Sequence, residues 1–282
     1  MTTIQDCLRE SRHLAPLSDT ARLDTEVLLA HVLQKDRSYL YTWPEKRLTD
    51  EQLYQYQQCL MRRERGEPIA YILGYQEFWS LRLAVNPSTL IPRPETELLV
   101  ELALELGGDK TSHKKLLDLG TGTGAVALAI ASERPAWHIT ALEKNHDAIS
   151  LAKSNQRTLH INNVDIIQSD WLTALQPLEH RFHMIVANPP YIDANDEHLS
   201  QGDVRFEPST ALVAGQAGLQ DIADIILSAS AFLESGGFLL LEHGYQQEQA
   251  VAQFLSQAGY RQIFCQQDIA GQPRVSGAQW LG

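Results

Sequence analysis

The sequence predicts an α/β protein in which a mostly parallel sheet with flanking helices follows a smaller domain made of helices. From residue 115 onward, short apolar runs alternate with longer segments of helical periodicity, and this alternation is typical of a parallel sheet covered by helices. Before residue 75, apolar residues recur mainly at three- to four-residue spacing, which indicates helices. The chain of 282 residues is also long for a single domain, so we expect two domains.

The first 75 residues predict a small helical domain. Ile4 and Leu8 lie on one face of a first helix. A second helix has an apolar face made of Leu23, Val27, Leu28 and His31. Thr49, with Gln52 three residues later, resembles a capping box, and we expect it to open a third helix that runs to Gly66.

A short segment of strand character joins the two domains. Hydrophobic and polar residues alternate over 78–85, which indicates a strand within a hairpin. Prolines then interrupt the chain before a helix that starts near Glu95. We therefore place a helical domain at 1–75, a hairpin linker at 76–94 and the larger domain at 95–282.

The larger domain carries the alternation of strands and helices. Strands are expected at 116–119, 139–143, 164–168, 182–187 and 238–242, and helices at 124–133, 146–159, 219–233 and 246–258. Two more short strand candidates follow the last helix.

Composition and charge narrow the function classes. Hydrophobic residues make up 44% and charged residues 21% of the sequence, which excludes disordered, collagen-like and coiled-coil proteins. No apolar run approaches the roughly 20 residues of a membrane helix, and Asp6 and Arg9 stand where a secretory peptide would be apolar. We therefore expect a cytoplasmic protein with no membrane partner. Cys7, Cys59 and Cys265 show no metal-ligand spacing, so we expect no metal.

The negative charge is concentrated in the second part of the chain. The net charge is −12, and residues 1–75 hold 10 basic and 11 acidic residues, whereas residues 76–282 hold 13 and 24. Nucleic-acid backbones are bound mainly by Lys and Arg, so this balance argues against direct DNA binding. We interpret the basic cluster Arg62, Arg63 and Arg65 as a solvated helix end.

A glycine-rich turn follows the first strand of the larger domain. It consists of Asp118, Leu119, Gly120, Thr121, Gly122, Thr123 and Gly124. Glycines allow a tight turn and a close approach of the backbone to a ligand, so the turn predicts a nucleotide-like cofactor. NAD is one candidate, because the loose dinucleotide fingerprint is satisfied and Glu143 ends the next strand, where a ribose-binding acid is expected.

The acid inside the turn favours a different cofactor. The carboxylate of Asp118 would repel a pyrophosphate, whereas S-adenosylmethionine carries no phosphate and has a cationic amino group and sulfonium. Glu143 would then accept both ribose hydroxyls. Asp170 and Trp171, after the third strand, would supply an acceptor and an aromatic wall for adenine.

A second motif follows the fourth strand, where open parallel sheets bind their ligands. It reads Asn188, Pro189, Pro190 and Tyr191. Prolines have no backbone N–H, so they leave carbonyl acceptors facing the cleft. A planar amide or amino-purine NH2 group could donate to the Asn188 side chain and to the Pro189 carbonyl while Tyr191 packs on its flat face. This arrangement would orient the nitrogen for attack on an electrophilic methyl group.

With these motifs, the chain resembles the amino-methyltransferases and, over nearly its whole length, the HemK/PrmC family. The family resemblance also includes residues 91–97 (Ile-Pro-Arg-Pro-Glu-Thr-Glu), 205–208 (Arg-Phe-Glu-Pro) and 211–212. It implies a Rossmann-like sheet of seven strands, S-adenosylmethionine as methyl donor, and the glutamine of a Gly-Gly-Gln loop in peptide-chain release factors as acceptor. It also implies that the helical domain docks this partner. Glu143 stands where relatives often have Asp.

Other functions compete with this one. A DNA adenine or cytosine methyltransferase would use the same Asn188 and Pro189 acceptors on a flipped base, but the charge balance and the lack of a target-recognition segment argue against it. A dinucleotide-dependent dehydrogenase would give no role to residues 188–191. A catalytically silent binding module is the third alternative, although every position needed for transfer is occupied. Phe78 and Trp79 fit a buried core and a substrate contact equally well.

Overall fold

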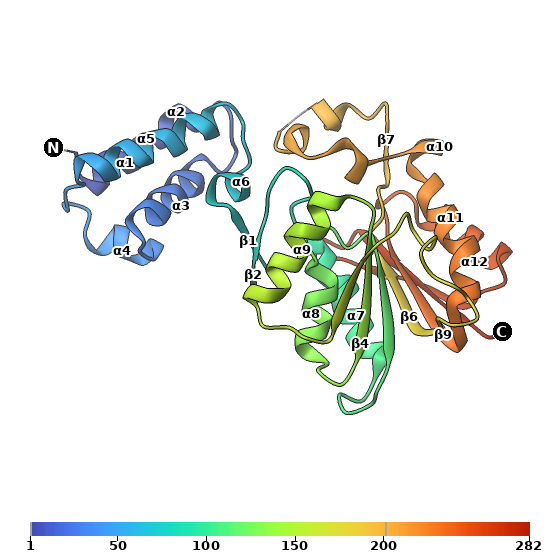
Figure 1. Ribbon diagram of the computed structural model, residues 1–282. Coiled ribbons are helices and arrows are strands. Elements are labelled where there is room, and N and C mark those ends of the chain that lie inside the picture. The colour runs from blue at the N-terminus through green and yellow to red at the C-terminus, as the bar shows by residue number, and fades with distance from the viewer. Residues whose placement is uncertain (1, 201) are drawn as a thin grey trace. The chain divides into compact units, whose positions relative to one another are not determined.

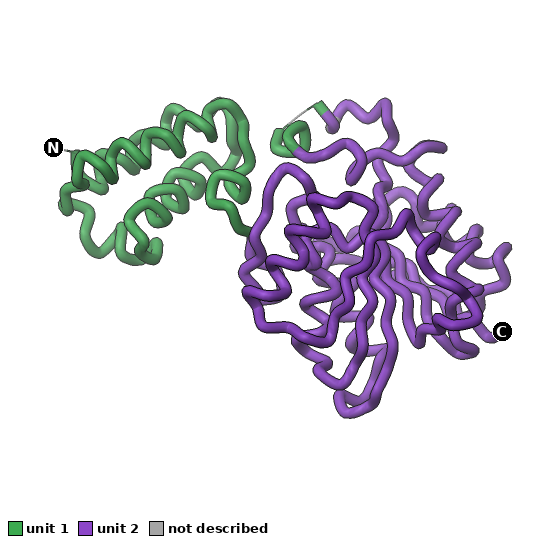
Figure 2. Tube along the Cα trace, in the orientation of Figure 1, with its two compact units in different colours: residues 1–75, 200–206 green, residues 76–199, 207–282 purple. Residues whose placement is uncertain are grey.

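The computed structural model describes residues 2–200 and 202–282 (Figure 1). The chain forms two compact units (Figure 2), one comprising residues 1–75 and 200–206 and the other residues 76–199 and 207–282. Within the described residues, no helix is long and apolar enough to cross a membrane.

The first unit is helical, as predicted. Its helices are α1 (Ile4–Arg9), α2 (Ser11–Leu14), α3 (Ala21–Leu33), α4 (Arg37–Thr42), α5 (Asp50–Glu64) and α6 (Ile69–Leu73). The predicted capping box is confirmed, because the Thr49 side chain accepts from the Gln52 N–H and the Gln52 side chain accepts from the Thr49 N–H. Leu14, Leu28 and Leu40 are fully buried in the core of this unit.

The predicted apolar face of α3 is partly wrong. Leu28 is buried, but Leu23 is exposed, and the acids Asp24 and Glu26 are buried instead. Helical periodicity alone could not show that these acids are buried, because a carboxylate is buried only where another segment of the chain supplies a partner for it. One such partner is Arg37, whose guanidinium lies 2.6 Å from the Glu26 carboxylate.

Arg63 also corrects an expectation, since it is buried rather than solvated. Its guanidinium lies 2.7 Å from Asp24 Oδ2 and 2.6 Å from Asp203 Oδ1. A buried arginine requires such partners. Asp203 belongs to the 200–206 segment of the same unit, so the ion pairs tie this distant piece of chain to α3 and α5.

The second unit begins with a hairpin and continues with the α/β alternation. The hairpin consists of β1 (Tyr75–Phe78) and β2 (Leu81–Ala84). The main elements that follow are η1 (Pro94–Thr96), α7 (Glu97–Gly107), β3 (Lys115–Leu119), α8 (Ala125–Glu133), β4 (His138–Glu143), α9 (His146–Thr158), β5 (Val164–Gln168), β6 (Phe182–Ala187), α11 (Gln220–Ala229), β9 (Leu233–Glu242), α12 (Glu248–Gln257), β10 (Arg261–Gln267) and β11 (Pro273–Trp280). Between β6 and α11 lie the short elements η2 (Glu197–Ser200), η3 (Val204–Phe206), η4 (Ser209–Ala211), α10 (Gly215–Gly218) and the strand pair β7 (Ile192–Asp193) and β8 (Val213–Ala214), and η5 (Ser230–Phe232) precedes β9.

The sheet has the predicted seven strands, in the order β10-β11-β9-β6-β3-β4-β5. Strands β9, β6, β3, β4 and β5 pair in parallel, and β11 runs antiparallel to both of its neighbours. The chain adds β4 and β5 on one side of β3 and then places β6 on the other side. The order therefore reverses between β3 and β6, which is where open α/β sheets bind ligands.

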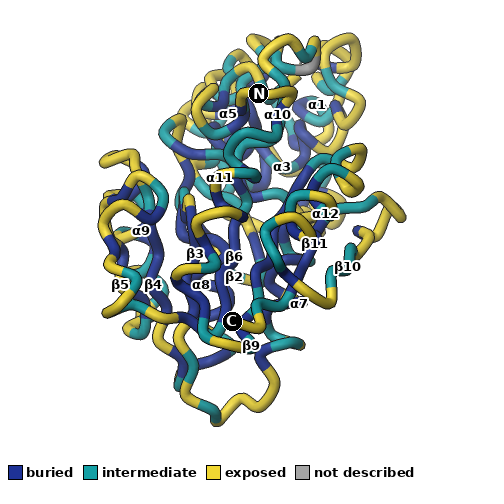
Figure 3. Tube along the Cα trace, turned by 90° about the vertical axis from the view of Figure 1, so that its right-hand side faces the viewer, coloured by how far each residue is buried: buried dark blue, intermediate teal, exposed yellow. Residues whose placement is uncertain are grey.

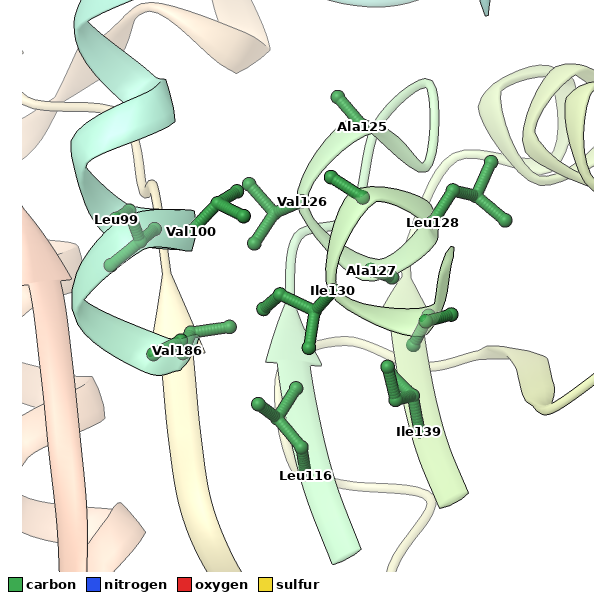
Figure 4. Close-up of a cluster of buried hydrophobic side chains, with 14 of the residues drawn as sticks. Leu99, Val100, Leu116, Ala125, Val126, Ala127, Leu128, Ile130, Ile139 and Val186 are labelled. Carbon is green, nitrogen blue, oxygen red and sulfur yellow. The ribbon is translucent and has the colours of Figure 1, made fainter. Parts of the chain in front are cut away.

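Two apolar layers cover the faces of this sheet. Leu116 and Leu117 are neighbours on β3 but belong to different layers, because successive side chains of a strand point to opposite faces. Figure 4 shows the first layer, in which Val100 of α7 points toward Val126 of α8, and Ile130 of α8 lies toward Leu116 of β3. The second layer includes α11 and α12. Figure 3 shows the central strands as buried, which gives the loops at their ends a rigid base.

The ends of one predicted helix and one predicted strand differ from those in the structure. The helix predicted at 219–233 ends at Ala229, and β9 begins at Leu233 rather than at residue 238. Gly236, with a φ of +84°, lets the strand continue through a segment that resembles a turn.

At the hairpin, Phe78 is fully buried in the first apolar layer, so it belongs to the core. Trp79 is partly buried against the same layer.

Candidate active site

The predicted motifs converge at the carboxyl edge of the sheet. The register pairs Leu119 at the end of β3 with Ala187 at the end of β6, so the glycine-rich turn and Asn188 leave neighbouring strands at the same level. A cavity of about 540 Å³ opens at this edge. Its lining includes the predicted residues Gly120, Gly122, Glu143, Asp170, Trp171, Asn188 and Pro190.

The glycine-rich turn is held open toward this cavity. Gly120 and Gly122 have φ values of +72° and +56°, which glycine adopts without strain. The N–H groups of Gly120 and Thr121 donate to the Leu142 carbonyl at 2.9 and 3.0 Å, which fixes the turn to β4. A Cβ atom on Gly122 would meet no protein atom within 4 Å, so a ligand can approach the backbone there.

Asp118 lies behind the turn rather than in the cavity lining. It is buried, and the Thr121 hydroxyl donates to its Oδ2 at 2.6 Å. Burial raises the pKa of Asp118 to about 7, against the opposing effect of hydrogen bonds from Thr121 and from the Ala127 backbone. The carboxyl therefore joins the turn to the start of α8. Thr121, Thr123 and Gly124 also lie outside the lining, so the direct cofactor contacts expected of Asp118 and of these residues stay predictions.

Glu143 presents a fixed carboxylate to the cavity. Its Oε2 accepts from the Gly122 N–H at 3.0 Å, and its Oε1 accepts from the N–H groups of Lys144 and Asn145 at 2.8 Å each. Three backbone hydrogen bonds hold this side chain in one position. The side chain is therefore preorganised as an acceptor where β4 ends, which fits the two hydroxyls of a ribose.

Trp171 and Asp170 lie at another part of the lining. The Trp171 ring lies beside Gly120, where an added Cβ would approach it to 3.4 Å. Burial raises the pKa of Asp221, against the opposing effect of a hydrogen bond from the Trp171 indole. The carboxylate of Asp170 lies 2.8 Å from Lys144 Nζ. This lysine therefore already uses part of the hydrogen-bonding capacity that Asp170 could offer to a ligand.

Asn188 is oriented by a side chain from another element. Its Nδ2 donates to Thr96 Oγ1 at 3.1 Å, which leaves Oδ1 to accept from a donor in the cavity. Pro190 lines the cavity, Pro189 is buried beside it, and Tyr191 is half-buried outside the lining. The Tyr191 hydroxyl donates to Glu242 Oε1 at 3.5 Å, and burial raises the pKa of this tyrosine.

Several lining residues escaped the sequence analysis. They include Ser88, Thr89, Leu90, Thr210, Val213 and Asp221. The first three precede the 91–97 motif, and the others come from the long connection after β6 and from α11. Asp221 gave no signal in the sequence, because an acid in the first turn of a helix is common for electrostatic reasons alone.

The fold and this site define a methyltransferase of the Rossmann-like type. Residues 95–210 match the methyltransferase small domain, and residues 6–74 match the PrmC N-terminal domain. A T. thermophilus 16S rRNA methyltransferase, solved in complex with AdoMet and guanosine, shares the fold with a TM-score of 0.52 and 19% identity, covering 73% of this chain and 49% of that chain.

Sequence relatives specify the family. The release factor glutamine methyltransferase of Shewanella oneidensis is 49% identical over 99% of this chain and 98% of its own length. The Escherichia coli K12 enzyme of the same name is 51% identical over 96% of this chain and 97% of its own length. The chain belongs to the release factor glutamine methyltransferase family, which confirms the resemblance predicted from the motifs.

Proposed function

We propose that this protein transfers a methyl group from S-adenosylmethionine to the side-chain amide nitrogen (N5) of the glutamine in the Gly-Gly-Gln loop of peptide-chain release factors, and so supports translation termination. The observation that carries the proposal is the placement of Asn188, whose Oδ1 is left for a donor in a cavity that Glu143 also lines. Relatives about 50% identical over nearly the whole chain are named for this activity.

The donor side of the cavity fits S-adenosylmethionine. Glu143 would accept from the ribose hydroxyls, Trp171 would pack on the adenine, and the open backbone at Gly122 would allow close approach. When bound, the cofactor supplies a methyl group on a positively charged sulfur. The net acidity of residues 76–282 suits a ligand that carries positive charge.

The acceptor side would hold the glutamine amide. Asn188 Oδ1 would accept one hydrogen of the NH2 group and the Pro189 carbonyl the other, with Tyr191 as a platform. An amide nitrogen is a poor nucleophile because its lone pair is conjugated with the carbonyl. Fixing both hydrogens would direct that lone pair at the methyl group, so orientation supplies most of the catalysis.

The first unit would dock the release factor. Its core is separate from the two layers of the sheet, and none of its described residues lines the cavity. Removing residues 1–75 should therefore reduce turnover of the intact partner much more than methylation of an isolated Gly-Gly-Gln peptide. Equal losses on both substrates would contradict the docking role.

A release factor substrate would also place the protein in the cytoplasm, without a DNA or membrane partner.

The decisive experiment is mass spectrometry of release factors after incubation with isotopically labelled S-adenosylmethionine. We expect one added methyl group on the glutamine of the Gly-Gly-Gln loop. Asn188→Ala serves as the inactive variant, and DNA oligonucleotides at low and moderate salt serve as alternative substrates. Methylated DNA with unmodified release factor would favour a DNA amino-methyltransferase and overturn the proposal.

A further inference from the structure

A glutamine outside the cavity holds the far end of the acceptor motif. Gln247, immediately before α12, is half-buried and does not line the cavity. Its Nε2 donates to the Tyr191 carbonyl at 3.0 Å and to the Ala217 carbonyl at 3.4 Å. Its Oε1 accepts from the Gly244 N–H at 2.9 Å. One side-chain amide therefore joins three segments, which are the acceptor motif 188–191, α10 and the loop after β9.

The orientation of this amide follows from the chemistry of its partners. A carbonyl oxygen can only accept a hydrogen bond, and a backbone N–H can only donate one. The NH2 group of Gln247 must therefore face the Tyr191 and Ala217 carbonyls, while its oxygen faces Gly244. Among side chains of this length, an amide offers a donor and an acceptor at once, whereas an ionised carboxylate offers no donor and a thioether offers none either.

The backbone around the Tyr191 carbonyl is tightly packed. A Cβ atom on Gly218 would approach the Tyr191 carbonyl oxygen to 2.1 Å and Gln247 Nε2 to 2.9 Å, so only glycine fits there. The two preceding residues, Gln216 and Ala217, have φ values of +52° and +55°, a region that residues other than glycine rarely adopt. Such backbone persists only where its surroundings hold it, and the hydrogen bond from Gln247 to the Ala217 carbonyl is one of the contacts that do so.

The position of the Tyr191 carbonyl matters because the acceptor motif has little freedom of its own. The rings of Pro189 and Pro190 fix φ at these two residues. The Asn188 side chain is held at one end of the motif, and the Tyr191 carbonyl is held by Gln247 at the other end. With both ends held, the Pro189 carbonyl, which we expect to accept from the substrate amide, keeps one direction.

We propose that Gln247 is a positioning residue that fixes the backbone of the acceptor motif through the Tyr191 carbonyl, and so directs the Pro189 carbonyl and the Tyr191 ring at the substrate amide. This inference rests on the proposed function of the same site. Without the donor of Gln247, the peptide group after Tyr191 can rotate, and the acceptor motif loses its alignment. The donor side does not depend on this contact, because Glu143 is held by backbone N–H groups of its own.

The first test is single-turnover methyl transfer to a release factor at saturating cofactor, with cofactor affinity measured by calorimetry. Gln247→Met keeps the length of the side chain but removes its donor and its acceptor. It should slow transfer by roughly ten- to a hundred-fold, because misplacement by about 1 Å can cost a hundred-fold, and cofactor affinity should stay nearly unchanged. Gln246→Met is the matched control, because Gln246 is the adjacent glutamine, is exposed and donates to the Tyr245 hydroxyl.

A second variant, Gln247→Glu, separates the hydrogen bond from packing. At pH 8 its ionised carboxylate can accept from Gly244 but cannot donate to the Tyr191 carbonyl, so transfer should be slow. The protonated carboxyl regains one O–H donor. The rate, divided by the wild-type rate at the same pH, should therefore rise as the pH is lowered from about 8 to about 5, toward the usual glutamate pKa of about 4.3. This division cancels the titration of groups that both proteins share, and Gln247→Met should show no such recovery.

The outcomes discriminate between positioning and other roles. A Gln247→Met variant with the wild-type rate would overturn the proposal, as would a Gln247→Glu variant whose relative rate does not change with pH. A loss of rate explained by weaker cofactor binding would assign Gln247 to the donor side instead. Thermal unfolding shows whether each variant is folded, and Gln247→Glu, which has the shape of glutamine, decides the question if Gln247→Met is not. Failure of the wild-type protein to methylate any release factor would refute the proposed function, and this inference with it.

Discussion

The two sides of the cavity are held in different ways. On the donor side, backbone N–H groups fix the Glu143 carboxylate. On the acceptor side, Asn188 is oriented by the side chain of Thr96, which accepts from the Asn188 amide. Backbone contacts persist when neighbouring side chains change, whereas a contact between two side chains is lost when either one changes. We therefore expect donor-side variants to affect affinity and acceptor-side variants to affect rate.

The largest effect should come from Asn188→Ala. This variant removes the acceptor for one hydrogen of the substrate amide, so the nitrogen loses its alignment with the methyl group. Loss of one preorganised hydrogen-bond partner typically costs about 2.7 to 4 kcal/mol, or roughly a hundred- to a thousand-fold in turnover. Single-turnover kinetics would measure it, with cofactor affinity determined in parallel.

Asn195→Ala is the control for this variant, because Asn195 is exposed and donates hydrogen bonds to Asp193 in its own loop. A rate loss in Asn188→Ala that merely follows weaker cofactor binding would move Asn188 to the donor side and remove the contrast between the two sides.

Glu143→Ala should have the next largest effect, and it should be of the opposite kind. The variant leaves the ribose hydroxyls and the N–H groups of Gly122, Lys144 and Asn145 without their acceptor. The expected cost is roughly 1 to 3 kcal/mol in cofactor affinity, measured by calorimetry, with a nearly normal rate at saturating cofactor. Glu179→Ala, at an exposed position outside the cavity, should change neither. Unaltered affinity in Glu143→Ala would mean that the ribose binds elsewhere.

Much of the fold and part of the site followed from the sequence. The alternation of short apolar runs with segments of helical periodicity predicted the strands β3 to β6 and the helices between them, because this pattern fits few other folds. The motif residues Gly122, Glu143 and Asn188 line one cavity, because the carboxyl ends of parallel strands meet at one edge, whereas their contacts with cofactor and substrate stay predictions. Asp118 shows the limit of this reasoning, since spacing does not reveal whether a side chain faces the ligand or the protein.

Contacts between distant segments could not be predicted. Burial of Arg63 depends on Asp24 and on Asp203, which is 140 residues away. The same holds for Asn188, whose amide donates to Thr96, a residue 92 positions earlier in the chain. Periodicity describes neighbours within one element, and such side-chain networks form only when separate elements pack.

The smallest effect should come from Tyr191→Phe, which tests whether the ring or the hydroxyl of Tyr191 matters. The hydroxyl contact with Glu242 is long at 3.5 Å, so its loss should cost less than about 1 kcal/mol in turnover, whereas Tyr191→Ala also removes the ring and should cost considerably more. Tyr260→Phe is a suitable control, because Tyr260 donates to the Ile226 carbonyl, away from the cavity, and should affect stability without reducing the rate. If Tyr191→Phe and Tyr191→Ala reduced the rate equally, the hydroxyl would be the essential group and the platform role of the ring would be lost.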